Sequence, residues 1–456
     1  MTTLIFPEGS IYPDSAVNQE STIYALAKLT ETGEKRLLVQ GDQTGFEGEV
    51  RGELLVCELT AANAAQLRLR LSWLNPAPLG RQTSFGFGDR LGSATPGHIA
   101  ALRVVDPQKS IAPIFAQQSV RENTRSGRTP QEVLDDAMWG IFQEGWCEPW
   151  GADADHIKEA SDLAPFIDAG YTFFTIDPSD YVDNEAQTDN LEALQKKADQ
   201  LSWERLGSSY DSMKVQYCAD PSSLDGLTLG FDEETFLRAL VKYGWAILHT
   251  ADIAALLDEK MSGLGYDLEM SVDETDTPTS IHEHYFIANE LHARGIPVVS
   301  LAPRFVGKFQ KGVDYMGDID EFEVELARHM AILHHFDGYK ISIHTGSDKF
   351  SIYGTNTDQA QGYVHVKTAG TSYLEALRVI AHQDPALFRK MLDLAHKNFE
   401  KDRKTYFVDC QPQKVPRSAE LTDAQLPDLL EQFDARQLLH VTFGSILDAY
   451  GVDLHA

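Results

Sequence analysis

Hydrophobic and polar residues alternate in two different rhythms along the 456-residue chain. Up to about residue 80, short alternating runs such as RLLVQGD, GELLVCELT and LRLRLSWL are separated by glycine-containing breaks, which is typical of β-strands. From about residue 84, short apolar runs alternate with amphipathic helical stretches, the rhythm of a parallel α/β fold. The sequence therefore predicts a small, mainly β N-terminal module over residues 1–80 and a larger α/β domain over residues 81–456.

Eight segments of the larger domain have the length and apolar character of buried strands, and helical stretches separate most of them. In chain order they are SFGFGDRLG, IAPIFAQQS, ADHIK, YTFFTIDPS, YDLEMSVDE, IPVVSLAPR, YKISIHTGS and YVHVKTAGT. Eight strands with intervening helices match a (β/α)8 barrel of the TIM type better than an open, doubly wound sheet. We therefore predict that this barrel forms the catalytic domain.

Two helix-rich segments lie outside the regular alternation. Residues 190–262, between the fourth and fifth strands, are predicted to form a helical insertion that serves as a lid or as a contact in a homo-oligomer. The segment from Tyr373 onward is also rich in predicted helix, and we expect it to close the barrel wall.

The composition narrows the classes of function. The 69 acidic and 39 basic residues give a formal net charge of −30, which argues against nucleic acid and against an anionic membrane as partners. The four cysteines are scattered without a Cys-x-x-Cys spacing, so a reducing cytoplasm suits the chain best. The N-terminus lacks the pattern of a signal peptide, and no apolar window reaches the length of a membrane span. These features predict a soluble, cytoplasmic protein.

Polar residues gather where the predicted strands end, which is where barrel enzymes carry their chemistry. Three histidines, His156, His344 and His365, occupy such positions. A single buried histidine is more often a hydrogen-bonded core residue, but three at strand ends, with a carboxylate from the fifth strand, suit Zn, Mn, Co or Ni. The pattern therefore predicts a divalent-metal site. His282 and His284 point apart on a predicted helix, and we interpret them as structural.

A glycine-rich stretch, GFGDRLG, follows the first strand of the barrel. Its third glycine comes one position too late for a G-x-G-x-x-G dinucleotide loop, and neither a Walker loop nor a G-x-S-x-G elbow occurs. The sequence therefore contains no motif for nicotinamide binding, phosphoryl transfer or serine hydrolysis. The backbone amides of this stretch and Arg90 could receive an anion, but a tight glycine turn before a helix explains it equally well.

Five long motifs stand out: SFGFGDRLGSATPGHI, GADADHIK, YTFFTIDPS, KISIHTGSDKFSIY and HVKTAGTSYLEAL. Together they resemble the tagaturonate/fructuronate epimerase family, whose relatives include ketose 4-epimerases, and the resemblance covers about residues 84–380. It implies a divalent-metal enzyme that inverts one hydroxyl-bearing carbon of a small anionic keto-uronate, with an acid/base pair on Asp155 and Glu269. His156 and His344 are the firmest metal candidates. Three residues compete for the third ligand position: His365, Glu269 and Gln310.

Tagaturonate and fructuronate differ at a carbinol carbon β to the ketone, whose C–H bond the carbonyl does not acidify. Two routes remain, a retro-aldol cleavage and re-formation of the bond between the α and β carbons, or hydride transfer through a tightly held redox cofactor. The missing dinucleotide loop favours the first route, with the metal as a Lewis acid that stabilises the enediolate. The candidates to bind the substrate carboxylate are Lys158, Arg304, Lys340 and Lys367. The candidates to hold hydroxyls are Asp89, His98, Gln118, Asp177, Ser347 and Asp348.

Other functions would use the same residues. A metal-dependent aldolase or aldose–ketose isomerase acting on a sugar acid needs the same barrel, metal and acid/base pair, and a ketose 4-epimerase would act on fructose and tagatose. A glycosidase with two carboxylates needs no histidine cluster. A non-enzymatic sugar-acid binding protein offers no reason for histidines beside carboxylates.

Overall fold

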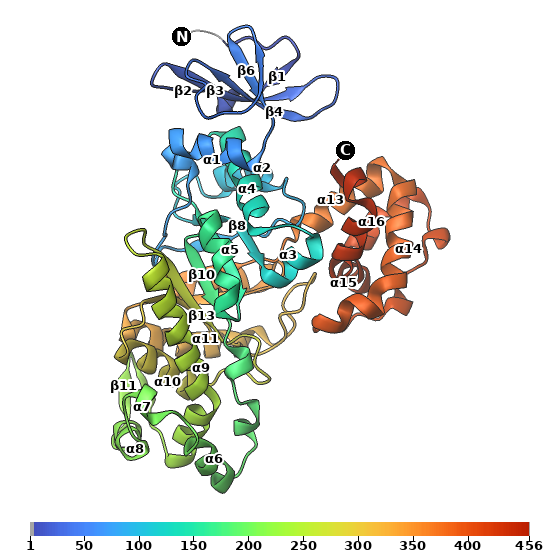
Figure 1. Ribbon diagram of the computed structural model, residues 1–456. Coiled ribbons are helices and arrows are strands. Elements are labelled where there is room, and N and C mark those ends of the chain that lie inside the picture. Colours follow the sequence, from blue (N-terminus) through green and yellow to red (C-terminus); the bar gives the residue numbers. More distant parts are fainter. Residues whose placement is uncertain (1–3, 456) are drawn as a thin grey trace.

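The N-terminal part of the computed structural model is a six-stranded antiparallel sheet, drawn in blue in Figure 1. The structure describes residues 4–455, apart from the side chains of residues 355–358 and 455. The sheet has the strand order β1-β3-β4-β6-β5, and β2 pairs with β3. Its strands are β1 (Gly9–Ile11), β2 (Val17–Gln19), β3 (Thr22–Leu29), β4 (Lys35–Gln40), β5 (Glu49–Arg51) and β6 (Leu54–Cys57). The predicted β-rich N-terminal module is therefore confirmed.

One run that alternation assigned to a strand is helical instead. The segment LRLRLSWL forms the end of α1 (Ala61–Arg70) and a single 3-10 turn at Ser72–Leu74. The helix begins at Thr60, whose side chain accepts a hydrogen bond from the Asn63 amide, as an N-cap does. Leu67 and Leu71 lie four residues apart and are both buried, so the apolar spacing also fits a helix.

Eight parallel strands close into a barrel in chain order, as the sequence predicts. Each strand pairs only with parallel neighbours, so every strand ends at the same face of the barrel. The strands are β7 (Ser84–Gly86), β8 (Ala112–Ser119), β9 (Gly151–Ile157), β10 (Phe173–Ile176), β13 (Asp267–Ser271), β14 (Val298–Ala302), β15 (Lys340–His344) and β16 (Val364–Lys367).

Helices connect the strands and form the barrel's outer layer. They are α2 (Thr95–Val105), α3 (Val120–Ser126), α4 (Pro130–Glu144), α5 (Leu163–Ala169), α9 (Glu233–Lys260), α10 (Ile281–Ala293), α11 (Ile319–Phe336) and α12 (Phe350–Ala360). Capping boxes begin α4 at Thr129 and α10 at Ser280, which are local signals that sequence reading can recognise.

The insertion between β10 and β13 is present and mostly helical. It contains α6 (Leu191–Ala198), α7 (Trp203–Leu206), α8 (Tyr210–Cys218) and a hairpin of β11 (Ser222–Leu224) and β12 (Leu227–Leu229), which the sequence analysis missed. Its last predicted helix, α9, is the wall helix of the barrel and packs against α6 and α10. By length and composition α9 could also span a membrane, contrary to the sequence expectation, but most of it is buried inside the protein, as in a core helix.

The C-terminal helices form a separate body instead of closing the barrel wall (Figure 1, orange and red). They are α13 (Ser372–Gln383), α14 (Pro385–Asp402), α15 (Phe433–Val441) and α16 (Phe443–His455). Phe388, Met391 and Leu438 belong to a hydrophobic core of their own, distinct from the barrel core. The apolar faces of these helices pack against one another instead of against the barrel. The chain therefore leaves the barrel after β16, at α13.

Candidate metal centre and active site

Imidazoles and carboxylates from neighbouring strands meet at the face where the barrel strands end. Ladder pairing places Glu269 of β13 beside Thr175 of β10, and His344 of β15 beside Lys367 of β16. All these strands are parallel, so their last inward-facing side chains converge at one level. His156, at the end of β9, completes the group, with its ring centroid 5.1 Å from that of His344.

His344 is held between two carboxylates. Its Nε2 lies 2.7 Å from Glu269 Oε1, and its Nδ1 lies 3.2 Å from Asp273 Oδ1. Burial disfavours the charged imidazole, but Asp273 and Glu269 outweigh it and raise the pKa of His344 to about 9. Glu269 therefore orients the ring so that Nδ1 points to Asp273.

His156 reaches the same site because β9 contains a bulge. Strict alternation would send Asp155 and His156 to opposite faces of the strand. The ladder with β10 instead contains one extra residue on β9, and His156 has a left-handed φ of 54°. Burial opposes the charge on this imidazole, but Asp155 and Asp177 outweigh it and raise the pKa of His156 to about 10.

The donor atoms fit a divalent cation. Donor atoms of His156, Asp273 and His344 all lie within 4.8 Å of one another, a spacing that metal–ligand bonds of about 2.1 Å can span. His156 Nδ1 and Asp177 Oδ2 are both buried and lie 3.4 Å apart, and neither has another partner at hydrogen-bond distance among the described residues. His156 and Asp177 also form a second such group with Glu274. Two nitrogens and carboxylate oxygens suit Zn, Mn, Co or Ni.

Lys367 lies at the centre of an acidic cluster under the metal site. Its Nζ is 2.8 Å from Asp153 Oδ2, 3.1 Å from Asp155 Oδ1 and 2.9 Å from Glu269 Oε1. Burial raises the pKa of Asp153 to about 7, although Lys367 opposes the shift. Burial would also raise the pKa of Asp155, but His156 and Lys367 hold it well below its usual value. Asp155 is thus ionised beside the metal site, and Lys367 is engaged by protein groups.

Two predicted residues lie lower in the barrel than the metal site. His365 pairs with Ser342 and Ser84 in the ladder, one inward-facing position below Lys367, and its Nδ1 lies 2.8 Å from Ser84 Oγ. Lys340 begins β15 at the opposite end of the barrel, where its Nζ donates to the carbonyls of Gly80 and Gln82, both at 2.9 Å. Neither belongs to the candidate metal site: the residue grouped with His156 and His344 is Asp273 instead of His365, and Lys340 bonds protein groups at the other end of the barrel.

On β8 the inward-facing glutamine is Gln117, and the predicted Gln118 points away. Gln117 Nε2 donates to Asp155 Oδ2 at 3.1 Å. Gln118 pairs with Ala154, whose side chain points away from the barrel interior, while the adjacent Asp153 contacts Lys367. Because the two faces of a strand alternate, Gln118 lies outside the site.

The glycine-rich loop after β7 is a structural turn. Asp89 accepts hydrogen bonds from three backbone amides of its own loop, at 2.7–2.9 Å. Arg90 is buried, bonds the carbonyl of His440 and Glu122, and stacks on the ring of Phe443. His98 stacks on Phe87, with ring centroids 4.9 Å apart. The loop attaches the C-terminal helices, and none of its three predicted residues reaches the metal site.

The predicted residues in the loops after β14 and β15 also lie where the C-terminal helices attach to the barrel. Gln310 Oε1 accepts from the Asp409 amide at 2.8 Å and from Gln437 at 2.9 Å, so this oxygen is engaged by the C-terminal segment. Ser347 donates to the Val313 carbonyl at 3.0 Å. Burial raises the pKa of Asp348, which lies beside Lys349.

Two predicted residues, Asp177 and Lys158, lie beside His156. Asp177 Oδ2 is 3.4 Å from His156 Nδ1. Lys158 Nζ lies 3.6 Å from the same Asp177 oxygen and donates to Ser179 at 2.7 Å. Arg304 follows β14 and bonds Thr279 through its backbone.

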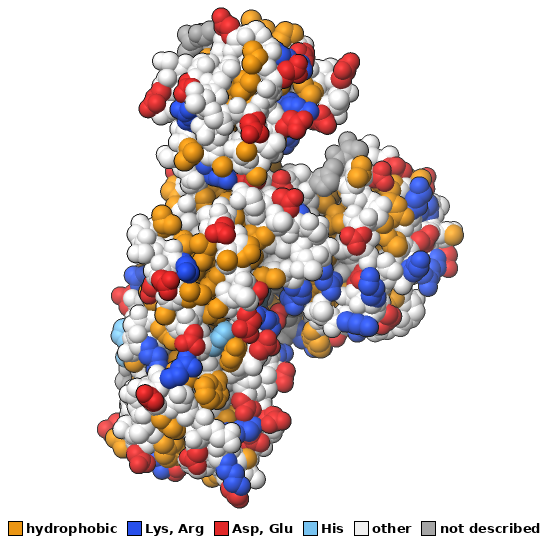
Figure 2. Space-filling model, in the orientation of Figure 1, with side chains coloured by type: hydrophobic (Ala, Val, Ile, Leu, Met, Phe, Trp, Pro, Cys, Tyr) orange, Lys and Arg blue, Asp and Glu red, His pale blue; other side chains and the backbone are white. Residues whose placement is uncertain are grey.

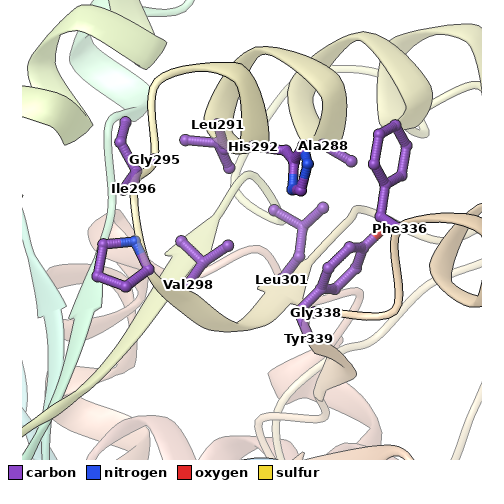
Figure 3. A pocket seen from close by; sticks show the side chains of 11 residues that line it. Ala288, Leu291, His292, Gly295, Ile296, Val298, Leu301, Phe336, Gly338 and Tyr339 are labelled. Atoms are coloured by element: carbon purple, nitrogen blue, oxygen red, sulfur yellow. The ribbon is translucent and has the colours of Figure 1, made fainter.

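A cavity of about 280 Å³ lies at the other end of the barrel (Figure 3). Its walls come from α10, from the start of β14 and from the turn between α11 and β15, and side chains such as Leu291, Val298 and Phe336 make them mainly apolar. The strand-end carboxylates do not reach it. The candidate active site is therefore the metal centre.

Asp273 has a signal in the sequence, although it is not among the predicted metal ligands. Glu269, Ser271 and Asp273 alternate along β13 and just beyond it, so all three face the site once the strand is assigned. Gln117 could be identified only from the register of β8, which decides whether Gln117 or Gln118 faces the barrel interior.

A family profile, a relative and solved structures all indicate the same family. A profile of the tagaturonate epimerase family matches residues 12–454. A tagaturonate/fructuronate epimerase of Thermotoga maritima is 42% identical over 444 residues, which cover 96% of this chain and 89% of that protein. The native crystal structure of a fructuronate-tagaturonate epimerase from Cohnella laeviribosi aligns with a TM-score of 0.90 at 36% identity, covering 97% of this chain and 89% of that one. A glycerol complex of that enzyme aligns with a TM-score of 0.89 at 37% identity, covering 97% and 88%.

Proposed function

Because the chain belongs to the tagaturonate epimerase family, we propose that it interconverts tagaturonate and fructuronate by inverting one hydroxyl-bearing carbon. The observation that carries the proposal is the group formed by His156, Asp273 and His344 beside the ionised Asp155. This arrangement combines a cation site with a proton acceptor, which the chemistry at a carbinol carbon requires.

We propose that His156, Asp273 and His344 hold a divalent cation. Bound there, the cation would supply Lewis acidity that stabilises negative charge on the substrate oxygens. His344 offers Nδ1, since its Nε2 faces Glu269 at 2.7 Å. A carboxylate behind a histidine ligand fixes the ring and increases its basicity. We therefore assign Glu269 the positioning of His344, in place of the acid/base role that the sequence predicts for it.

Asp155 is our candidate for proton transfer. It is nearly buried, and the ammonium of Lys367 and the amide of Gln117 hold its two oxygens from below. In the retro-aldol route Asp155 accepts the proton of the β-hydroxyl group, and the bond between the α and β carbons breaks. The electron pair of the broken bond stays with the α carbon and the ketone as an enediolate, and the β carbon becomes the carbon of an aldehyde.

Re-formation of the bond on the other aldehyde face gives the epimer, and the new alkoxide takes up a proton again. No atom is gained or lost overall. The aldehyde must turn without leaving, so the side chains around it must retain the substrate while the bond is open. Asp177 and Lys158, beside His156, are our candidates to bond hydroxyl groups during this step.

Proton NMR of the purified protein with tagaturonate tests the proposal, with chelator-treated protein and add-back of Mn or Zn. We expect fructuronate to appear, and the rate to fall on chelation and return with metal. Shorter fragments as products would identify an aldolase. Equal conversion of tagatose would identify a ketose 4-epimerase, and no change in either sugar would overturn the proposal.

A further inference from the structure

Basic side chains gather between the barrel and the C-terminal helices, and Figure 2 shows Lys and Arg along this junction. Arg121 follows β8 at the start of α3, and Lys311 lies in the loop between β14 and α11. Both face the ring of Tyr406, which follows α14. The guanidinium carbon of Arg121 is 5.4 Å from the ring centroid, and Nζ of Lys311 is 5.9 Å from it.

This cluster borders the metal site. Arg121 Nη2 lies 3.2 Å from Glu274 Oε1, and Glu274 shares a potential ligand group with His156. The side chain of Lys311 lies against Gly346, two residues after His344. A Cβ at position 346 would come within 2.8 Å of Lys311 Cδ. These contacts place Arg121 and Lys311 on the side of the barrel where His156 and His344 lie.

Lys311 differs from the buried lysines of the described chain. Each of those donates to carboxylate, hydroxyl or carbonyl oxygens: Lys242, Lys340, Lys349 and Lys367. The ammonium of Lys311 has no hydrogen-bond or ion-pair partner among the described residues, and its side chain is half-buried. Burial lowers the pKa of Lys311, and Glu122 opposes the shift. Part of the residue's surface is exposed, so an anionic ligand can approach the ammonium and form charge-assisted hydrogen bonds with it.

Tyr406 adds a second unused group. Its hydroxyl is buried without a hydrogen-bond partner. The segment that carries it is fixed to the Lys311 loop, because Gln310 Oε1 accepts from the Asp409 amide at 2.8 Å. The tyrosine is therefore held over Lys311 and Arg121, and the C-terminal helices contribute directly to this side of the site.

Resting on the proposed function, we propose that Lys311 binds the carboxylate of the substrate, assisted by Arg121 and the hydroxyl of Tyr406. This contact selects a ketose that carries an acid group over a neutral ketose. Among the residues predicted for this role, Lys340 and Lys367 are engaged by protein groups. Lys311 has no such partner among the described residues, and a carboxylate there would accept charge-assisted hydrogen bonds.

Steady-state kinetics of Lys311→Met and Lys311→Arg with tagaturonate test the assignment. We expect Lys311→Met to raise KM by about 10- to 100-fold with kcat changed by less than about threefold, as loss of one charge-assisted hydrogen bond implies. Lys311→Arg should restore most of the affinity, and Tyr406→Phe should give a smaller rise in KM. Lys404→Met, which removes an exposed lysine two residues from Tyr406, should leave KM unchanged.

Thermal stabilisation by tagaturonate measures binding without turnover and separates this proposal from the epimerase proposal. If the wild type binds tagaturonate but does not convert it, the epimerase proposal fails while the carboxylate contact can still be measured. An unchanged KM and unchanged stabilisation in folded Lys311→Met would overturn the assignment. A fall in kcat at constant KM would overturn it as well, because it would indicate a role in the chemical step.

Discussion

Glu269 Oε1 lies 2.7 Å from His344 Nε2, so the other ring nitrogen of His344 faces Asp273. The carboxylate has no exposed surface and also contacts Lys367. The buried carboxylate of Glu269 thus orients the ring of His344, a proposed metal ligand, and offsets the positive charge of Lys367. This is the arrangement in which a carboxylate behind a histidine tunes a metal site.

Glu269→Gln should therefore weaken metal binding without abolishing it. The amide can still accept from Nε2, but the negative charge that supports the imidazole is lost. We expect the affinity for Mn or Zn to fall about 10- to 100-fold and the activity to recover partly at high metal concentration. Titration against a competing chelator measures the affinity. An affinity equal to that of the wild type would contradict the positioning role.

The third metal ligand can be identified by comparing two variants. Asp273→Asn should lose most of its bound metal, and kcat/KM should fall by about 1,000-fold or more, because a carboxylate ligand is removed. His365→Gln should keep its metal, since His365 lies one position lower and bonds Ser84. Metal analysis of the purified variants gives the answer. Asp276→Asn, at an exposed position three residues further on, is the matched control.

If His365→Gln loses metal while Asp273→Asn retains it, the ligand assignment is reversed. Thermal unfolding of both variants must accompany the analysis, because His365 is completely buried. A variant that binds no metal and is also unfolded would not count as evidence for a lost ligand.

Lys367→Met should destabilise the folded protein severely. The substitution leaves Asp153, Asp155 and Glu269 facing one another in the barrel without their shared cation. Breaking a buried ion pair by removing one partner costs about 3–5 kcal/mol. Urea unfolding should show a loss of this size. Lys349→Met, which removes a buried lysine bonded to carbonyls, provides a comparison. A loss no larger than about 1 kcal/mol in Lys367→Met would contradict the central role of the lysine.

The barrel could be predicted from sequence because its signals are local. Each strand is a short apolar run, and the helices between them have their own periodicity and caps. The C-terminal body could not be separated from the barrel, because an amphipathic helix shows that it has an apolar face but not which surface covers that face. The segment LRLRLSWL shows the same limit, since its leucines fit a helix as well as a strand.

Within the site, alternation predicts the face of a strand on which a side chain lies but not its height in the barrel. Lys340, Ser342 and His344 share a face, yet Lys340 closes the opposite end. The choice between Gln117 and Gln118 depends on strand register, and His156 enters the site only through a bulge. Lys311 lies in a loop without periodicity, so only the tertiary structure brings it to the site.

Stability should fall at mildly acidic pH because of a buried histidine pair outside the active site. His284 on α10 and His329 on α11 share a hydrogen bond of 2.8 Å between their Nδ1 atoms, and the Tyr339 hydroxyl lies 2.8 Å from His284 Nε2. One Nδ1 must donate and the other accept, so protonation of the accepting histidine leaves two N–H donors facing each other. Burial lowers the pKa of His329 to about 4 and that of His284 well below 6.5, with His329 adding to the latter shift.

Since these pKa values are depressed, the unfolded chain takes up protons first as the pH falls. The stabilisation is complete above about pH 6.5 and is lost progressively between about pH 6.5 and 4. Each histidine should contribute about 1 kcal/mol to the loss between pH 7.5 and 5.5. Urea unfolding at both values should show a smaller decrease in His329→Gln than in the wild type. His335→Gln, an exposed position on the same helix, should behave like the wild type. The same decrease in all three proteins would exclude the pair as its cause.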